Sequence, residues 1–232
     1  MDMASSRDSE ARARPVGRPR ADGSTRSGDV REEVLAVAAE LFIDQGYSAT
    51  TTRQISGAVG LRQGSFNHYF TRKLDILREL LDQTLGPALS ALDDLDPSIS
   101  AEHRLWVLLS TDCANLVSGE QNLASLMLLP EARNDEFADF WAARDRLKDI
   151  YRSAITAGIA SGVLVPIDVE LGLAATFGLV ESLAMWFDPK SDLTADDASL
   201  HVARAALAGL LLNPGSVDEI INSPTTNPIS DT

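Results

Sequence analysis

A short polar stretch, RQGSFNHY from Arg62 to Tyr69, carries the side chains in this sequence that are best suited to recognise another molecule. Arg, Gln and Asn can each form two hydrogen bonds with the edge of a DNA base, whereas Ser, Tyr and Lys reach phosphate groups. From Gln45 to Leu74 there are 4 basic residues and no acidic one, as a surface that binds a polyanion requires. The pattern indicates a DNA-binding surface; a solvated polar face of a small helical hairpin is the plainer alternative.

Two short helices must position these side chains. Thr51 can cap the first helix, because its hydroxyl can accept a hydrogen bond from a free backbone amide of the first turn. Gly60 ends that helix, since glycine adopts a left-handed conformation without steric cost. The second helix is expected from Arg62 to Phe70. The apolar residues of both helices recur at helical spacing and should face the core: Ile55, Ala58, Val59, Phe66 and Phe70.

These features belong to a longer pattern. In chain order it comprises Val34, Leu35, Ala38, Ala39, Leu41 and Phe42; Gly46-Tyr47; Thr50-Thr51-x-Arg53-x-Ile55; and Gly60-Leu61-x-x-Gly64-x-Phe66-x-His68-x-Phe70-x-x-Lys73-x-x-Leu77. The pattern resembles the N-terminal DNA-binding domain of the TetR family of bacterial transcriptional regulators. The resemblance covers about residues 28–80 and implies a three-helix domain that contains a helix-turn-helix motif.

The resemblance also implies roles for single residues. It places three residues on the DNA phosphates, namely Thr51, Tyr69 and Lys73. It places four near base edges, namely Arg62, Gln63, Ser65 and Asn67, with His68 on either. Two positions depart from the usual family pattern: Arg62 stands where a small capping residue such as Ser is common, and Asn67 stands where Tyr is usual. The second departure removes a frequent phosphate contact, so affinity should depend more on the N-terminal arm.

That arm comprises residues 1–27, which are rich in Arg, Ser, Pro and Gly without apolar periodicity, so we expect it to be disordered. Its Gly17-Arg18-Pro19-Arg20 segment resembles a short basic motif that lies in A·T-rich minor grooves. Basic arms beside a helix-turn-helix commonly reach the adjacent minor groove. Contact of Arg18 and Arg20 with DNA and a merely solvated basic tail remain equal alternatives.

The net charge of −14 is unevenly distributed. Residues 1–80 hold 12 basic and 11 acidic side chains, whereas residues 81–232 hold 8 basic and 23 acidic ones, so the acidity does not argue against DNA binding. The single cysteine, Cys113, excludes an internal disulfide and suits a reducing cytoplasm. We expect no signal peptide and no transmembrane helix, because the nearest apolar run, Leu171 to Phe187, is short and contains Glu181. These features predict a cytoplasmic protein that does not bind membranes.

The chain beyond the DNA-binding region is predicted to be helical throughout, giving an all-α protein. A helix that begins at Thr71 or Arg72 and runs to about Asp94, with a break at Gly86-Pro87, should connect the parts. Further helices are expected at about 101–118, 123–129, 135–161, 168–187 and 196–212. The domains are then a basic arm (1–27), the helix-turn-helix domain (28–80), an effector-binding and dimerisation bundle (81–214) and a flexible tail (215–232).

The last two predicted helices, at about 168–187 and 196–212, differ from the others. The first is apolar on nearly all sides and must therefore be covered on most of them. Small residues at Gly172, Ala175, Gly178 and Ser182 would allow close approach of another helix. Ordinary core packing is one interpretation. We prefer a two-helix face that pairs with its copy in a homodimer, because a protein that reads twofold-symmetric DNA needs a twofold axis.

A small-molecule effector could bind between the helices of this bundle, where pockets are mostly apolar with a few polar groups. The candidate residues are Trp106, Cys113, Met127, Trp141, Arg144, Phe177 and Glu181. No catalytic motif is present, and Asp197 with His201 offers too few ligands for a metal site, so we expect no enzyme, no metal and no cofactor. The sequence predicts a ligand-responsive repressor that binds a palindromic double-stranded DNA operator as a homodimer. Alternatives are a dimeric small-molecule-binding protein without sequence-specific DNA binding, and an enzyme with an unrecognised site.

Overall fold

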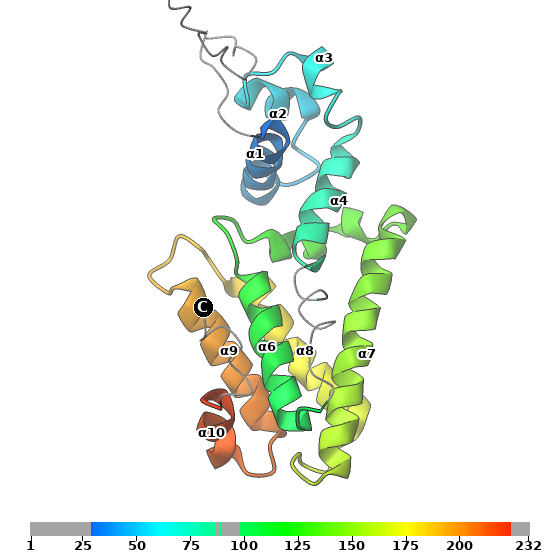
Figure 1. The fold of residues 1–232 in the computed structure, drawn as a ribbon. Coiled ribbons are helices and arrows are strands. Elements are labelled where there is room, and N and C mark those ends of the chain that lie inside the picture. Colours follow the sequence, from blue (N-terminus) through cyan, green and yellow to red (C-terminus); the bar gives the residue numbers. More distant parts are fainter. Residues whose placement is uncertain (1–28, 87–88, 90–97, 224–232) are drawn as a thin grey trace, which may run out of the picture.

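The computed structural model describes residues 29–86, 89 and 98–223. Within these residues the secondary structure is helical, apart from one isolated antiparallel bridge between Leu164 and Leu211. The prediction of an all-α protein is therefore confirmed. Figure 1 shows two parts, a small group of helices that we call the head (residues 29–83) and a larger bundle that we call the body (residues 101–221).

The head contains α1 (Val30–Asp44), α2 (Thr52–Ala58), α3 (Gln63–Phe66) and α4 (Lys73–Gln83). Apolar side chains from all four helices and from the turns between them form its core. These buried side chains include Val34, Leu35, Ala38, Phe42, Ile55, Val59, Phe66, Phe70, Ile76, Leu77 and Leu80. Ala58 is exposed rather than buried, so the prediction that it faces the core was wrong.

Local capping interactions set the helix boundaries in the head. Asp29 caps α1, and Thr51 forms a reciprocal capping box with Gln54 at the start of α2. Gly46 and Gly60 have positive φ angles of 92° and 65°, which glycine adopts without steric cost. The predicted roles of Thr51 and Gly60 in bounding α2 are confirmed.

The second recognition helix is shorter than predicted. Only Gln63–Phe66 is α-helical, and the chain continues to Phe70 through turns, in which the Tyr69 amide bonds to the Phe66 carbonyl at 2.9 Å. The side chain of Arg62 makes no capping hydrogen bond, and Gly64 lowers the helix propensity. The next helix, α4, ends at Gln83; most of its predicted extension towards Asp94 lies outside the described residues.

The body consists of five α-helices and four short 3₁₀ segments among the described residues. The α-helices are α6 (Ala101–Leu116), α7 (Ala138–Ala160), α8 (Val169–Trp186), α9 (Ala195–Leu210) and α10 (Val217–Ile221). The 3₁₀ segments are η1 (Leu123–Leu128), η2 (Pro130–Arg133), η3 (Asp135–Phe137) and η4 (Pro214–Ser216). Helix α6 packs against α7, α8 and α9. The segments η1 to η3 cross the end of the bundle that faces the head (Figure 1).

Two predicted boundaries in the body differ from the structure. The helix expected from Asp135 begins with three 3₁₀ residues and becomes α-helical at Ala138. The expected flexible tail from Gly215 contains α10, whose Val217 and Ile220 are buried and which packs against α6 and α9. This part of the tail is therefore helical, and residues 224–232 lie outside the described part of the chain.

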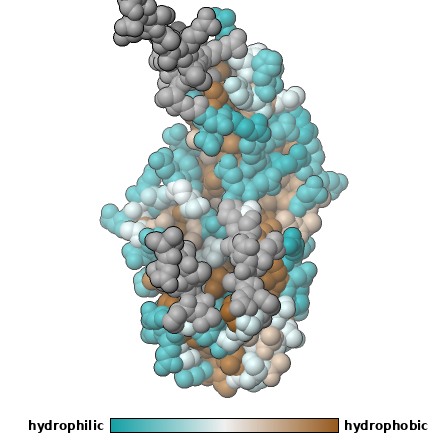
Figure 2. Space-filling view, viewed as in Figure 1, coloured by the Kyte–Doolittle hydropathy of each residue, from teal (hydrophilic) through white to brown (hydrophobic). Residues whose placement is uncertain are grey.

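Helix α8 is the one described helix that is long and apolar enough to cross a membrane by length and composition. It packs against α6, α7 and α9 within the bundle, and its Glu181 pairs with a buried arginine of α7, Arg144. We therefore interpret it as a bundle helix. On the face shown in Figure 2, hydrophilic residues predominate over the head, whereas hydrophobic residues show in patches over the body.

Candidate nucleic-acid interface and buried polar cluster

The α3 segment presents its polar residues on one side of the head. Arg62, Gln63, Asn67 and His68 are exposed, and Ser65 and Tyr69 are half-buried. The rings of this segment that face inward are Phe66 and Phe70, which lie in the core with centroids 6.4 Å apart. The predicted division between an outward polar face and an inward aromatic anchor is confirmed.

Two amide side chains on this surface support each other. Gln63 Nε2 donates a hydrogen bond to Asn67 Oδ1 at 3.0 Å, as residues four apart on a helix can. The buried Ser56 of α2 donates from its hydroxyl to Gln63 Oε1 at 3.4 Å. Both amides keep further donors and acceptors, so they are oriented without being saturated. This segment is therefore a preorganised hydrogen-bonding surface.

The four basic residues of the acid-free region fall into two pairs. Arg53 and Arg62 are exposed, and within the described residues neither side chain has a hydrogen-bond or ion-pair partner. Arg72 instead pairs with Asp75 and Glu136. Lys73 Nζ donates to the carbonyl oxygens of Tyr47 at 2.5 Å and Thr50 at 2.7 Å. The positive charge available to a polyanion is therefore smaller than the sequence suggests.

Lys73 is held inside the head. Its Nζ lies 4.0 Å from the centroid of the Tyr47 ring, and burial lowers the pKa of Lys73. The two carbonyl oxygens that it contacts belong to the turn that leads from α1 into α2. Lys73 therefore joins the first turn of α4 to the entry of the helix-turn-helix. Its predicted contact with phosphate remains a prediction, for which one N–H of the ammonium is left.

Thr51 and Tyr69 are also engaged by neighbours. The Thr51 hydroxyl lies 2.8 Å from the side-chain oxygen of Gln54, Oε1, and accepts a hydrogen bond from the backbone N–H of Gln54 at 3.2 Å. The carbonyl of Tyr69 accepts a hydrogen bond from Arg31 Nη1 at 3.0 Å, and Arg31 also pairs with Glu79 of α4. These contacts fix both ends of the segment from α2 to Tyr69. Arg18 and Arg20 lie outside the described residues.

The head also contacts the 3₁₀ segments of the body. Ser48 donates a hydrogen bond from its hydroxyl to Glu131 Oε1 at 2.5 Å, and Arg72 Nη1 donates to Glu136 Oε2 at 2.7 Å. Arg78 Nη2 donates to the backbone oxygen of Glu136, also at 2.7 Å. We call these three interactions the head–body contacts. They reach η2 and η3, the two segments that lie before α7 in the chain, and the spacing of residues in the sequence did not predict them.

The residues predicted to bind an effector do not all gather in one place. Trp106, Cys113, Met127 and Phe177 are buried in the body. Trp141 lies beside η2, where its Nε1 donates to the Ala132 carbonyl at 2.6 Å. The two charged candidates, Arg144 and Glu181, form an ion pair between α7 and α8. The structure therefore brings Arg144 and Glu181 together and places Trp141 at the end of the bundle near the head.

A second polar pair that the sequence reasoning missed lies close to Arg144. Asp112 of α6 is 2% exposed, and Tyr151 Oη donates to Asp112 Oδ2 at 3.4 Å. Burial raises the pKa of Asp112 to about 6, and the positive charge of Arg144 opposes this shift. We call Asp112, Arg144 and Tyr151, together with the partly exposed Glu181 that pairs with Arg144, the buried polar cluster. Its signal in the sequence was the position of Asp112, four residues from both Leu108 and Leu116 and therefore on the same inward face.

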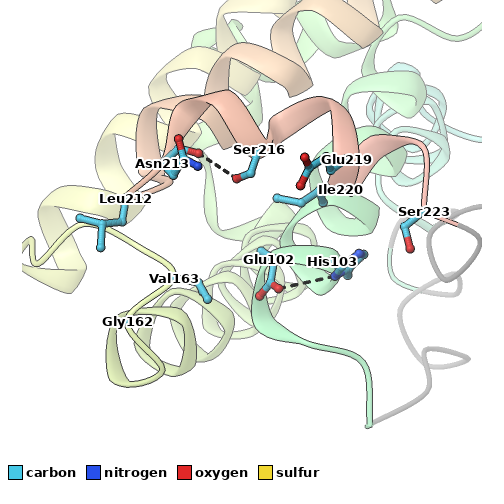
Figure 3. A pocket seen from close by; sticks show the side chains of 10 residues that line it. All are labelled: Glu102, His103, Gly162, Val163, Leu212, Asn213, Ser216, Glu219, Ile220 and Ser223. Carbon is cyan, nitrogen blue, oxygen red and sulfur yellow. Dashed lines mark hydrogen bonds and ion pairs between the residues drawn. The ribbon is translucent and has the colours of Figure 1, made fainter.

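Two hollows lie elsewhere on the described surface. One, of about 380 Å³, lies between the first turn of α6 and α10 and is lined by Glu102, His103, Asn213 and Glu219 among others (Figure 3). The other, of about 450 Å³, lies between α1, α4 and the loop before η1 and includes Glu32, Glu40 and Glu120. The acidic side chains that line both hollows make them unsuited to polyanions.

Comparison with known proteins gives matches along most of the chain. Residues 34–80 match the family model described as bacterial regulatory proteins of the tetR family, and residues 114–210 match a tetracyclin repressor-like C-terminal domain. The crystal structure of Mycobacterium smegmatis AmtR is 34% identical, covers 88% of this chain and 95% of its own, and superposes with a TM-score of 0.70.

Two characterised relatives are more distant. The HTH-type transcriptional repressor KstR2 of Rhodococcus jostii is 28% identical, with 83% of this chain and 96% of the relative covered. The fatty acid metabolism regulator protein of Bacillus subtilis is also 28% identical, with 70% of this chain and 87% of the relative covered. The similarity extends over both the head and the body.

Proposed function

The chain belongs to the TetR family of bacterial transcriptional regulators, and we propose that it represses transcription as a homodimer that binds a palindromic operator. It is a ligand-responsive DNA-binding protein rather than an enzyme. The single observation that best supports the proposal is the α3 surface, where exposed Arg62, Gln63 and Asn67 project from a rigid head that has no acidic residue between Gln45 and Leu74. Such a surface matches the major groove in both shape and hydrogen-bonding chemistry.

We assign base recognition to Arg62, Gln63, Ser65 and Asn67, with His68 on bases or phosphates. Arg62, Gln63 and Asn67 are exposed, which supports this assignment. We assign phosphate contacts to Thr51 and Tyr69 and, through its remaining N–H, to Lys73. The basic arm would add minor-groove contacts through Arg18 and Arg20. Phosphate contacts would supply much of the affinity and make it depend on salt.

The domain division follows the same proposal, with the arm at 1–27 and the DNA-binding domain at 28–80. The effector-binding and dimerisation domain begins at 81 and extends beyond the expected end at 214 to include α10, which packs on the body. Dimerisation would occur through α8 and α9. Large apolar side chains on these helices are exposed in the single chain, including Leu171 (64%), Met185 (75%) and Trp186 (47%). An exposed apolar face of this kind on a protein monomer typically marks an interaction surface.

The effector would be a small and largely apolar molecule bound within the body. The apolar lining supplied by Trp106, Met127 and Phe177 suits such a molecule, and the name of the Bacillus subtilis relative, a fatty acid metabolism regulator, is compatible with it. The effector needs to favour one head arrangement by only about 1–3 kcal/mol to change operator affinity. The head–body contacts offer a direct route, because Glu131 and Glu136 precede the helix that carries Arg144.

Selection of bound duplexes from a random DNA pool tests the proposal, followed by a salt titration of the selected sequence. We expect a palindromic motif whose affinity falls steeply with salt, by roughly 0.9 in log–log slope for each phosphate contact. The double variant Arg62→Ala, Asn67→Ala should select no motif. Lys148→Ala, which removes a basic residue from the surface of α7, serves as the matched control and should behave as the unmodified protein.

A failure to enrich any duplex, with and without metabolites from a cell extract, would contradict the proposal. It would favour the second candidate, a dimeric small-molecule-binding protein without sequence-specific DNA binding. The departures at Arg62 and Asn67 from the family pattern are the observation behind that candidate. Cytoplasmic location is part of the proposal, since the operator is there.

A further inference from the structure

The buried polar cluster lies where α6, α7 and α8 meet, in a part of the body that is otherwise apolar. Arg144 is at its centre and is 1% exposed. A buried arginine keeps its charge, and a buried charge is costly unless hydrogen bonds satisfy it. The partners of Arg144 therefore determine what this cluster can do.

Arg144 has few partners within the described residues. Its Nη2 pairs with Glu181 of α8, but Nε and Nη1 are buried without a hydrogen-bond partner. The nearby carboxylate of Asp112 is instead turned to the Tyr151 hydroxyl, at 3.4 Å. Guanidinium N–H groups on two of the three nitrogens of Arg144 are thus free to bind an acceptor.

No buried side-chain acceptor in the described chain is left without a partner to match these donors. The buried side-chain atoms without a partner in the described chain are Arg144 Nε, Arg144 Nη1 and Asn115 Nδ2, all of which are donors. Asn115 lies three residues along α6 from Asp112, on the same side of the helix. Because neighbouring helices hold an excess of buried donors, the molecule that best satisfies them has acceptor atoms and few donors.

The side chains around the cluster indicate the chemical character of the remainder of such a molecule. The ring of Phe177 packs edge-on against Tyr151, with centroids 5.0 Å apart, and Cys113 beside them is fully buried. Burial raises the pKa of the Cys113 thiol, which therefore acts as a small apolar group. An acceptor oxygen carried by an apolar body suits these neighbours.

We propose that Arg144 binds the acyl oxygen, carboxylate or carbonyl, of an otherwise apolar effector, with Asn115 as a second donor. The inference rests on the proposed function insofar as the molecule is an effector, and it names the chemical class that the body recognises. Glu181 holds Nη2 of the same guanidinium. An acyl oxygen that binds Nε and Nη1 shares its positive charge and thereby weakens the link from α7 to α8. Since α8 also carries the exposed apolar face, the cluster joins recognition of the effector to the position of that helix.

The test uses the full-length protein and measures binding directly, by calorimetry and thermal unfolding, with a defined set of probes that share an eight-carbon chain. The set comprises octanoate, methyl octanoate and octylamine, so that it compares a carboxylate, a neutral acyl oxygen and a donor without an acyl oxygen. We expect octanoate or methyl octanoate to bind and to raise the unfolding temperature, and octylamine to have no effect. Binding of octanoate alone identifies the carboxylate as the source of the oxygen, and binding of both compounds identifies the carbonyl.

Variants then assign the contact to Arg144. Arg144→Leu should weaken acyl binding by about a hundredfold, as loss of hydrogen bonds from a charged group implies. Lys148→Leu, on the surface of the same helix, is the matched control and should bind as the unmodified protein. Glu181→Gln leaves Arg144 in place and removes its competing anion, so it should bind octanoate more tightly even if Arg144→Leu fails to fold.

The proposal is overturned if no acyl probe binds at millimolar concentration, if octylamine binds as well as octanoate, or if Glu181→Gln and Arg144→Leu leave binding unchanged. Operator binding is measured separately on the same preparations. Acyl binding without operator binding would contradict the repressor function and leave the acyl site standing. Operator binding without acyl binding would do the reverse.

Discussion

Arg72, the residue that precedes α4, and Glu136, two residues before α7, are hydrogen-bonded at 2.7 Å although 64 positions separate them in the sequence. Arg78 strengthens this junction by donating to the Glu136 backbone oxygen. The contact joins the helix that leads out of the DNA-binding head to the helix that carries Arg144. A movement of α7 therefore reaches the head through the body surface as well as along the chain.

Replacement of Glu136 by Gln should loosen this junction. Both side chains are about half exposed, so the free energy of unfolding should change by no more than about 1 kcal/mol. Local opening should nevertheless increase, and hydrogen exchange measured by mass spectrometry should become faster in the first turn of α4. Glu120→Gln, on an exposed loop, is the control. Equal exchange in both variants would show that the contact does not hold α4.

A substitution of Lys73 distinguishes two possible roles of this residue, which are to hold the turn before α2 and to contact a DNA phosphate. If it braces the turn at Tyr47 and Thr50, Lys73→Met should lower the free energy of unfolding by about 1–3 kcal/mol, since two carbonyl oxygens lose a charged donor. Chemical denaturation measures this loss in the absence of DNA. A residue that only contacts phosphate would leave stability unchanged and reduce the salt slope of operator binding by about 1. Arg53→Met, which removes an exposed charge, is the comparison.

The contrast between Thr51 and Lys73 shows how far the sequence could predict this structure. The cap by Thr51 and the turn at Gly60 depend on residues within four positions, so local spacing was sufficient. The position of the Lys73 ammonium depends on carbonyl oxygens more than 20 residues earlier, which have no sequence signature because every residue has a carbonyl. The pairing of Arg72 with Glu136 is also between residues far apart in the sequence, and it could not be predicted either.

The core of the body shows a similar division. Helical periodicity predicted the helices of the body, and Phe177, Arg144 and Glu181 were chosen from them for their chemistry. The periodicity could not show that Arg144 of α7 meets Glu181 of α8, nor that Asp112 turns to Tyr151 instead, because both depend on how three helices rotate against one another. Register between helices is fixed by packing over the whole core.

Side chains of the α3 surface should separate into two classes when mutated. Asn67→Ala or Gln63→Ala should relax base preference at particular positions, each at a cost of about 1–3 kcal/mol on the preferred operator. Tyr69→Phe should weaken binding to all sequences alike. Because Gln63 and Asn67 are hydrogen-bonded to each other, the double variant should cost less than the sum of the single ones. Additive losses, measured by fluorescence anisotropy, would show that they act independently.

Asp112 should make stability depend on pH in an unusual direction. Its pKa is about 6 in the folded protein, whereas an ordinary aspartate has a pKa of 3.8, so between these values the folded state binds more protons than the unfolded state. Asp112 therefore contributes its full stabilisation below about pH 4. The free energy of unfolding falls as the pH rises to about 6, and above that pH it is lower by about 3 kcal/mol. Asp112→Asn should remove this fall, as urea denaturation at a series of pH values would show. An unchanged profile in the variant would assign the fall to other groups.

Gly178, on the exposed side of α8, allows the proposed dimer face to be tested without disturbing the single chain. A Cβ atom added at Gly178 has no neighbour within 4 Å, so Gly178→Arg should fold as before. In a dimer formed through α8 and α9 the added side chain would prevent close approach of the partner helix and bury a charge, which is costly without a counter-ion. Sedimentation analysis should then show a monomer with an unchanged helical content. Ala157→Arg, at an exposed position of α7, should remain dimeric. Dimers in both variants would place the interface elsewhere.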